Sequence, residues 1–340
     1  MTDDWTRVEP TPELVDQVVA GFGLGPISGW RDLGGSWTTN LLLGCSRGDV
    51  VARVHQRRTT SERVRAEQAA RAALADAGIP TVVPLTDRGD GTVQLVNDRP
   101  VEIEPFRAWT DRMNTPDLVR RGFTLLGSVH DVLREADLPD AARSVVRANH
   151  IGADEAAAVT RAGAARLRRS GDPELARFAD DAERHADAVW RAEAPLLADQ
   201  VVQVVHGDFW DNNVLFAEGE VAALLDFGFM AQRPRVDDLA LTIWFLLLEP
   251  GAGLPTDDSI ALVAQLLDAY DAGTHRPLSA AERASLPLAV ARQPAWSVGG
   301  WVLALDETNA YRHARAAVPE QPVAAAVLRD LARWQDALAT

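Results

Sequence analysis

Residues 206–216 read HGDFWDNNVLF, and residues 221–228 read VAALLDFG. Each segment contains a short apolar run, and the two are separated by turn residues. This pattern indicates two strands joined in a hairpin. Because a hairpin brings strand ends together, we expect Asp208, Asn213 and Asp226 to lie close to one another.

Two carboxylates and an amide oxygen in one place are hard oxygen ligands. Mg²⁺ prefers one or two carboxylates, with phosphate oxygens and waters completing its shell. A carboxylate that does not bind the metal can position an attacking hydroxyl and accept its proton. The segment therefore contains a candidate base and candidate metal ligands, which are the groups that phosphoryl transfer requires. Catalysis of this reaction is mostly positioning and charge neutralisation.

The order His-Gly-Asp, four further residues, Asn, and then Asp-Phe-Gly resembles the aminoglycoside phosphotransferase and choline kinase family. These are small-molecule kinases with a protein-kinase-like fold. The resemblance implies that Asp208 and Asn213 are catalytic, with Asp208 as the base, and that Asn213 and Asp226 bind Mg²⁺. It also implies that His206 braces the loop and that Asp238, in an Asp-Leu-Ala triplet, steadies it.

The N-terminal third is expected to contain paired strands and one helix. Short apolar runs predict strands at residues 41–43, 50–54, 92–96 and 100–103. Good helix formers over 62–77, preceded by the capping residues 59–61, predict a helix.

The rest of the chain reads as mostly helical. Helices are predicted at about 117–136, at 154–198 and after 237, with short strands at 201–205 and 221–225. We therefore expect an α+β, protein-kinase-like, two-lobed fold. Residues 1–103 would form a small nucleotide-binding lobe with an antiparallel sheet and one helix. Residues 104–340 would form a larger, mostly helical lobe for catalysis and acceptor binding.

Three parts of the N-terminal lobe match the family's nucleotide site. Gly34, Gly35 and Ser36 begin a loop whose backbone amides can approach phosphates closely, although an ordinary turn has the same composition. Arg53 stands where the family usually has a lysine, and Glu67 stands on the helix where the family has the partner glutamate. The last part, the connector with Glu102, Ile103 and Glu104, would meet the adenine edge with its backbone.

Arg53 departs from the family pattern because its guanidinium is planar and binds phosphate in a fork. We expect it to hold the phosphates with Glu67 as its partner, since the chain contains no lysine. The alternative is a surface arginine on an edge strand, with Glu67 paired to Arg63 or Arg71 at helical spacing. In that case nucleotide affinity would be low or the protein inactive.

Composition excludes several classes of protein. The net charge of −15 argues against a nucleic-acid partner. The absence of lysine excludes a pyridoxal Schiff base and an ordinary Walker A loop. The acidic first residues predict no targeting segment, and the longest apolar stretch, 239–248, is about half the length that spans a bilayer. We therefore expect a cytoplasmic protein, a monomer or homodimer, with no membrane partner.

The function predicted from these residues is an ATP- and Mg²⁺-dependent O-phosphotransferase. Its acceptor would be a small, aminated and cationic molecule such as an aminoglycoside-like antibiotic or natural product. The alternatives are a homoserine- or choline-type kinase, a degenerate nucleotide-binding protein, and a metal phosphohydrolase using His206, Asp208 and Asp226. The last would need further histidine ligands.

Other residues carry weaker expectations. Asp237 is expected to be a solvated carboxylate, Asp211 to be structural or exposed, and His130 to serve packing. Aromatic candidates for the acceptor pocket are Trp37, Trp210, Trp296 and Trp301. Acidic candidates for a cationic acceptor are Glu249, Asp257, Asp258, Asp268, Asp271, Asp306 and Glu307.

Overall fold

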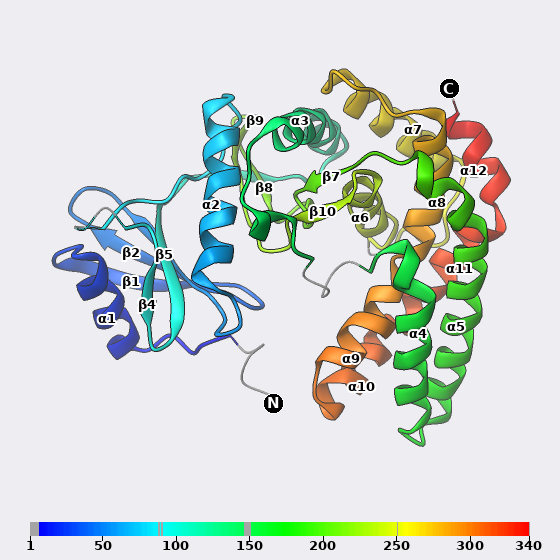
Figure 1. Ribbon diagram of the computed structural model, residues 1–340, viewed down its shortest axis with the longest axis horizontal. Helices are drawn as coiled ribbons and strands as arrows, with labels where there is room; N and C mark the ends of the chain where they lie inside the picture. The colour runs from blue at the N-terminus through cyan, green and yellow to red at the C-terminus, as the bar shows by residue number, and fades with distance from the viewer. Residues whose placement is uncertain (1–6, 88, 90, 146–150, 250, 340) are drawn as a thin grey trace. The chain divides into compact units, whose positions relative to one another are not determined.

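The structure, a computed structural model, describes residues 7–87, 89, 91–145, 151–249 and 251–339. Within these ranges the chain forms two compact units (Figure 1). The first runs to Asp111 and adds Ala136–Ala142 and Leu215–Leu225, and the second holds the remainder. The predicted lobe boundary at residue 103 thus lies within a strand of the first unit.

The first unit is built on a five-stranded sheet in the order β1-β2-β3-β5-β4, with antiparallel neighbours throughout. Its strands are β1 (Ile27–Gly34), β2 (Thr39–Cys45), β3 (Val50–Val54), β4 (Gln94–Val96) and β5 (Arg99–Pro105). Both predicted hairpins are confirmed, as β2–β3 and β4–β5. Asn97 and Asp98 join β4 to β5 with φ of 51° and 60°, the backbone that a two-residue type I′ turn requires.

Two helices pack on this sheet. Helix α2 (Ser61–Asp76) confirms the predicted helix and is capped by Thr60, whose hydroxyl accepts from the amide of Arg63. Helix α1 (Pro12–Phe22) lies outside the predicted elements. Its signals are nonetheless in the sequence, because Thr11 caps it, a proline opens it, and Gly23 ends it with a left-handed φ of 61°.

The two faces of the sheet differ in chemistry because successive side chains of a strand point to opposite sides. Val101 and Ile103 of β5 join the apolar core that α1 completes. Glu102 and Glu104 alternate with them and point to the face where α2 lies, since both bind side chains of that helix. Arg53 is the register partner of Glu102 and shares this polar face.

The second unit is mostly helical, as predicted. Its α-helices are α3 (Pro116–Glu135), α4 (Ala153–Arg168), α5 (Pro173–Glu193), α6 (Val236–Leu247), α7 (Asp257–Ala272), α8 (Ala280–Arg292), α9 (Val302–Ala304), α10 (Glu307–Ala317), α11 (Gln321–Arg329) and α12 (Leu331–Leu338). A π-helix, Trp296–Trp301, follows α8. None of the helices in the described residues is long and apolar enough to cross a membrane.

Short strands border the segment of residues 206–216, which contains Asp208 and Asn213. β7 (Val202–Val205) pairs antiparallel with β10 (Ala231–Pro234). β8 (Val214–Ala217) lies between β6 (Asp111–Arg112) and β9 (Glu220–Leu224). The predicted strands at 201–205 and 221–225 are therefore confirmed as β7 and β9. The loop with the candidate catalytic residues runs from the end of β7 to the start of β8.

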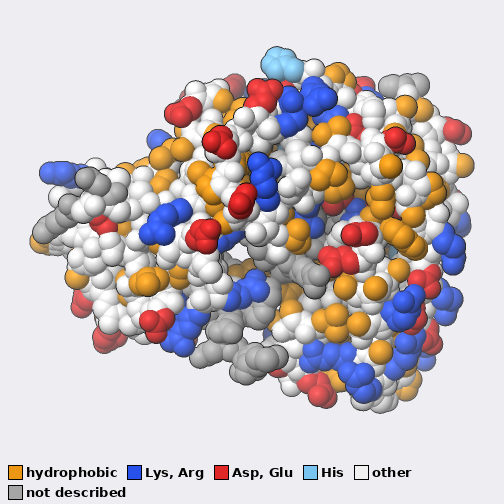
Figure 2. All heavy atoms as spheres, viewed as in Figure 1, with side chains coloured by type: hydrophobic (Ala, Val, Ile, Leu, Met, Phe, Trp, Pro, Cys, Tyr) orange, Lys and Arg blue, Asp and Glu red, His pale blue; other side chains and the backbone are white. Residues whose placement is uncertain are grey.

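Helices α4 and α5 run side by side and are joined in two ways (Figure 1). Buried Ala164, Leu167, Leu175 and Phe178 form an apolar seam. At the surface, arginines of α4 pair with carboxylates of α5, for example Arg168 with Asp180 and Glu183. In Figure 2, blue arginines and red carboxylates are accordingly intermixed over these helices.

Candidate active site

The second residue of the loop after β7 is a glycine that no other residue can replace without a shift of the backbone. Gly207 has a φ of 81°, and a Cβ placed on it would lie 2.0 Å from the backbone oxygen of Phe229. The chain can therefore turn sharply between the end of β7 and Asp208 only because residue 207 has no side chain.

Asp208 and Asn213 are brought together by direct hydrogen bonds. Asn213 Nδ2 donates to the backbone oxygen of Asp208 at 2.8 Å and to its carboxylate Oδ2 at 2.9 Å. Both residues are buried. Since the amide nitrogen faces the carboxylate, the Oδ1 of Asn213 is the atom that can accept a cation.

His206 holds the loop from inside. Its ring is fully buried, and its Nδ1 accepts a hydrogen bond from the backbone amide of Asp208 at 3.2 Å. The ring packs against Phe209 and Phe227, with centroids 5.9 Å and 4.5 Å away. The second contact joins the catalytic loop to the segment that contains Asp226.

Asp238, in the first turn of α6, anchors the beginning of the loop. Its two carboxylate oxygens accept the backbone amides of His206 and Gly207, each at 2.8 Å. His130 of α3 also lies on this carboxylate, with Nε2 3.1 Å from Oδ2, and its Nδ1 lies 2.9 Å from the hydroxyl of Tyr270. His130 thus has a polar role that the packing expectation missed.

Asp226 adopts an uncommon backbone conformation, with a φ of 60°. Its Oδ1 accepts the amide of Gly228 at 3.4 Å. An amide oxygen from Asn213 and a carboxylate from Asp226 are donors that fit Mg²⁺, which takes its other ligands from phosphates and water. Within the described ranges, no three His, Cys, Asp or Glu side chains are grouped as a metal site of their own.

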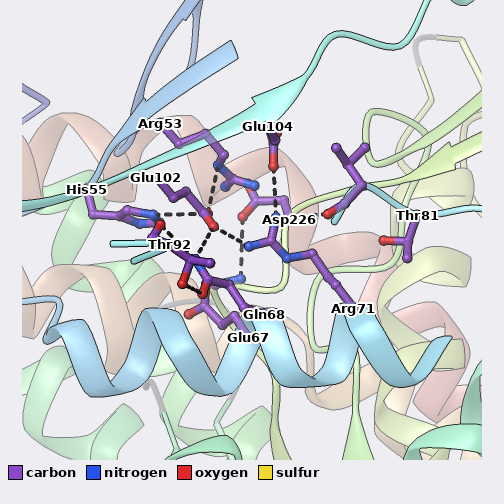
Figure 3. A network of polar contacts seen from close by, with 12 residues as sticks. Arg53, His55, Glu67, Gln68, Arg71, Thr81, Thr92, Glu102, Glu104 and Asp226 are labelled. Carbon is purple, nitrogen blue, oxygen red and sulfur yellow. Dashed lines mark hydrogen bonds and ion pairs between the residues drawn. The ribbon is translucent and has the colours of Figure 1, made fainter. Parts of the chain in front are cut away.

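Arg53 of β3 belongs to a buried polar network in the first unit (Figure 3). Its Nε lies 4.0 Å from Glu102 Oε1, and the ring of His55 approaches the same oxygen at 3.3 Å. Arg71 of α2 forms ion pairs with both Glu102 and Glu104. Burial alone would raise the pKa of Glu102, but the charge of Arg71 and the contacts with His55 and Arg53 outweigh it and hold that pKa well below its usual range.

Glu67, the predicted partner of Arg53, pairs with Arg63 one helical turn earlier, at 2.9 Å. This is one of the pairings that the sequence left open. The accompanying idea of a surface arginine on an edge strand is wrong, because β3 lies between β2 and β5 and Arg53 is buried. Sequence reasoning missed the side-chain role of Glu102. The alternation of Val101, Glu102 and Ile103 was the signal that could have found it.

The predicted phosphate loop follows β1. Gly34 and Gly35 have positive φ of 88° and 122°, and a Cβ on Gly35 would lie 2.3 Å from the backbone oxygen of Thr38. Asn40 closes the loop by donating from Nδ2 to the oxygen of Gly34 at 3.0 Å. Ser36 is exposed next to these glycines, so the backbone of the loop is open to solvent.

Several weaker candidates have structural partners. Asp237 is buried and pairs with Arg292, so the expectation of a solvated carboxylate is wrong. Trp210 stacks on Phe245 with centroids 4.8 Å apart, and Trp301 is buried. Three of the acidic candidates have structural partners in the helices: Asp306 caps α10, Asp271 of α7 pairs with Arg283 of α8, and Asp257 of α7 pairs with Arg333 of α12.

Known proteins resemble this chain over most of its length. A model described as the phosphotransferase enzyme family matches residues 30–283. The homoserine kinase of Phenylobacterium zucineum (strain HLK1) is 28% identical, covering 82% of this chain and 80% of its own. That of Afipia carboxidovorans (strain ATCC 49405 / DSM 1227 / KCTC 32145 / OM5) is 26% identical, covering 81% and 79%.

Solved structures of kinases share the fold. A microcompartment-associated aminopropanol kinase superposes with a TM-score of 0.68 at 17% identity, covering 96% of this chain and 98% of that one. An amicoumacin kinase in complex with AMP-PNP and Ca²⁺ gives 0.66 at 13%, covering 96% and 94%. The fold is therefore that of the protein-kinase-like phosphotransferases. With its family model matched over most of its length, this chain belongs to the phosphotransferase enzyme family and is a small-molecule kinase.

Proposed function

We propose that this kinase moves the γ-phosphate of ATP, in the presence of Mg²⁺, to the hydroxyl of a small amino-bearing acceptor, with homoserine as the first candidate. The observation that carries the proposal is the buried pair of Asp208 and Asn213, joined at 2.9 Å on a loop anchored to Asp238. A carboxylate held in this way can orient a hydroxyl group and accept its proton.

The metal would be held by the Oδ1 of Asn213 and the carboxylate of Asp226. When bound, Mg²⁺ neutralises charge on the transferring phosphates. Asn213 then has two tasks, because its amide nitrogen fixes Asp208 while its oxygen faces the cation. This double use explains why an amide suits position 213 better than a third carboxylate, which would repel Asp208.

ATP would meet three parts of the first unit. Arg53 would bind phosphate oxygens, and the loop of Gly34, Gly35 and Ser36 would approach them as well. The amides of Gly35 and Ser36 would make this approach, because the amide of Gly34 donates to Asp32 Oδ1 at 2.9 Å. Glu102 supports Arg53 from the adjacent strand, in the place where Glu67 was expected. The backbone of residues 102–104 would bind the adenine edge.

Two observations favour homoserine over an aminoglycoside-like compound as the acceptor. Curated homoserine kinases are similar to this chain over about four fifths of their length. In addition, three of the seven acidic candidates for a polycation, Asp257, Asp271 and Asp306, are engaged in a helix cap or in ion pairs. An aminoglycoside and a choline-type amino alcohol remain in the test as competing acceptors.

The test is ADP release with Mg²⁺ and ATP over L-homoserine, 1-amino-2-propanol, choline and a panel of aminoglycosides. Asp208→Asn should lower kcat by about 10²- to 10⁴-fold with little change in the KM for ATP, because the base acts on the acceptor in the transition state. Asp211→Asn is the matched control, since Asp211 is a half-buried carboxylate of the same loop, and it should keep activity within a few-fold of wild type.

Turnover of homoserine alone that is lost in Asp208→Asn would establish the function. Turnover of another acceptor would keep the mechanism and replace the substrate. Absence of ADP release with every acceptor would contradict the proposal and favour a nucleotide-binding protein without activity. Equal loss in both variants would contradict the assignment of Asp208 as the base.

A further inference from the structure

Arg292, the last residue of α8, joins four separate segments of the second unit. Its Nε contacts the carboxylate of Glu193 at 3.0 and 3.2 Å, and its Nη2 donates to Asp237 Oδ1 at 2.6 Å. Its Nη1 donates to the backbone oxygen of Ile151, just before α4. One side chain therefore ties α8, the end of α5, the approach to α4 and the first turn of α6 together.

These partners are all shielded from water. Arg292 is 5% exposed, and Glu193 and Asp237 are each 1% exposed. A buried ion pair is stable only where the geometry satisfies the charges on both sides. The planar fork of arginine directs its separate nitrogens to Glu193, Asp237 and the backbone oxygen of Ile151, a geometry that the single nitrogen of lysine cannot reproduce. Among the described residues, Asp237 Oδ2 has no hydrogen-bond partner, so Asp237 depends on Arg292 for its pairing.

Asp237 directly precedes Asp238, the anchor of the catalytic loop. The two carboxylates stand side by side in the first turn of α6, where their negative charges repel each other. Arg292 neutralises Asp237, and Arg233 of the neighbouring strand β10 adds positive charge that acts on both. Asp238 accepts the backbone amides of His206 and Gly207 with its two oxygens.

The anchoring of α6 therefore determines where the loop sits. Besides Asp238, the hydroxyl of Thr242 on the next turn donates to the backbone oxygen of Phe209, so α6 holds the loop on both sides of Asp208. A displacement of the first turn of α6 would move Asp208 with it. Small misplacements of a catalytic group reduce rate strongly, because phosphoryl transfer depends on alignment.

We propose that Arg292 is a positioning residue for phosphoryl transfer: through Asp237 it fixes the first turn of α6, and thereby the catalytic loop. The kinetic part of this inference rests on the proposed function. Arg292 touches neither Asp208 nor Asn213 directly in any contact found among the described residues, so its effect is transmitted through Asp237 and Asp238.

The test compares Arg292→Lys with Arg283→Lys. Arg283 lies on the same helix, is also buried, and pairs with Asp271 at 2.6 Å and with the backbone oxygen of Leu338. Its hydrogen bonds and ion pairs among the described residues thus go to α7 and α12 and not to α6, so it matches Arg292 in chemistry. Arg292→Lys should lower kcat by about 10-fold or more while the KM for ATP stays within about twofold. Arg283→Lys should lower the melting temperature to a similar extent and leave kcat within about twofold.

A second readout does not need turnover. Hydrogen exchange of the amides of His206 and Gly207 should become at least about 10-fold faster in Arg292→Lys, and remain as in wild type in Arg283→Lys. Unchanged exchange in folded Arg292→Lys, or equal acceleration in both variants, would overturn the proposal. If wild type releases no ADP with any acceptor, the proposed function fails, while the exchange result still decides the role of Arg292.

If Arg292→Lys does not fold, the same measurements are made on Asp237→Asn instead. The amide keeps a hydrogen-bond acceptor for Arg292 but removes the charge, so the same direction of change is expected in kcat and in exchange at a smaller size. Wild-type values for both quantities in folded Asp237→Asn would overturn the proposal.

Discussion

Gly207 combines a left-handed φ with a close approach to another backbone segment, as Gly35 also does, whereas Gly25 has only the first of these constraints. Gly25 has a similar φ of 77°, yet a Cβ there would meet nothing within 4 Å, whereas a Cβ at Gly207 would overlap the oxygen of Phe229. We expect Gly25→Ala to lower the free energy of unfolding by about 1 kcal/mol, from backbone strain alone. Gly207→Ala should lower it by about 3 kcal/mol or more and abolish most activity.

Urea unfolding of the two variants measures the difference, which isolates the contact with Phe229 from the strain of the left-handed backbone. Equal losses in both variants would show that the loop adapts to a methyl group at position 207. Full activity of Gly207→Ala would contradict the placement of Asp208 by this turn.

The sequence alone could predict the partners of a residue only where those partners are close to it in the chain. Asp208 and Asn213 are five residues apart in one loop, so a local motif identifies both. Asp237 was not predictable, because its partner Arg292 stands on a helix that reaches it only after 55 further residues have folded. The sequence shows that residue 237 carries a carboxylate. Whether this carboxylate is buried and paired depends on which cationic residue, distant in sequence, the fold places next to it.

At the scale of elements, β5 presents a row of charges to α2 inside the first unit. Glu102 of that row has a pKa below its ordinary value of 4.5. Its contribution to stability is therefore complete above about pH 4.5 and is lost as the pH falls toward the lower, folded-state pKa. Glu102→Gln should cost about 3 kcal/mol near pH 7, because the charge of Arg71 loses a partner.

The cost of Glu102→Gln should shrink as the pH is lowered below about 4.5, where wild type loses the same interaction. Denaturant unfolding at a series of pH values checks this. Glu62→Gln, an exposed change in the first turn of the same helix, should follow the wild-type pH dependence within about 0.5 kcal/mol. A cost for Glu102→Gln that stays constant with pH would disprove the charged state of Glu102.

Elements themselves were largely predictable, because apolar periodicity and caps are local. The hairpins, α2, α3 and the helices after residue 237 follow from such patterns. The network of Arg53, Glu102 and Arg71 did not follow, since it requires β3, β5 and α2 to be in place first. The ion pair of Glu67 with Arg63 could be predicted, because residues four apart on a helix face each other, and the structure contains it.

At the scale of the whole molecule, the net charge of −15 acts on acceptors before they bind. A polycationic aminoglycoside would be drawn to this chain at low ionic strength, and salt would weaken that attraction. A zwitterion such as homoserine has no net charge to attract. We therefore expect the KM for homoserine to change less than about twofold between roughly 20 and 300 mM NaCl.

Steady-state kinetics over this salt range, with the KM for ATP measured in parallel, separates the acceptor from the nucleotide. A KM for the acceptor that rises about 10-fold with salt would instead indicate a cationic acceptor. It would favour an aminoglycoside over homoserine as the substrate.

The left-handed backbone of Asp226 sets stability against the proposed chemistry at one position. A non-glycine residue at a φ of 60° costs about 1 kcal/mol, which a glycine would recover. A glycine there would also remove the carboxylate that we propose for Mg²⁺. A substitution that makes the protein harder to unfold would thus cost it its metal ligand, so a screen for stability alone would select against the proposed reaction.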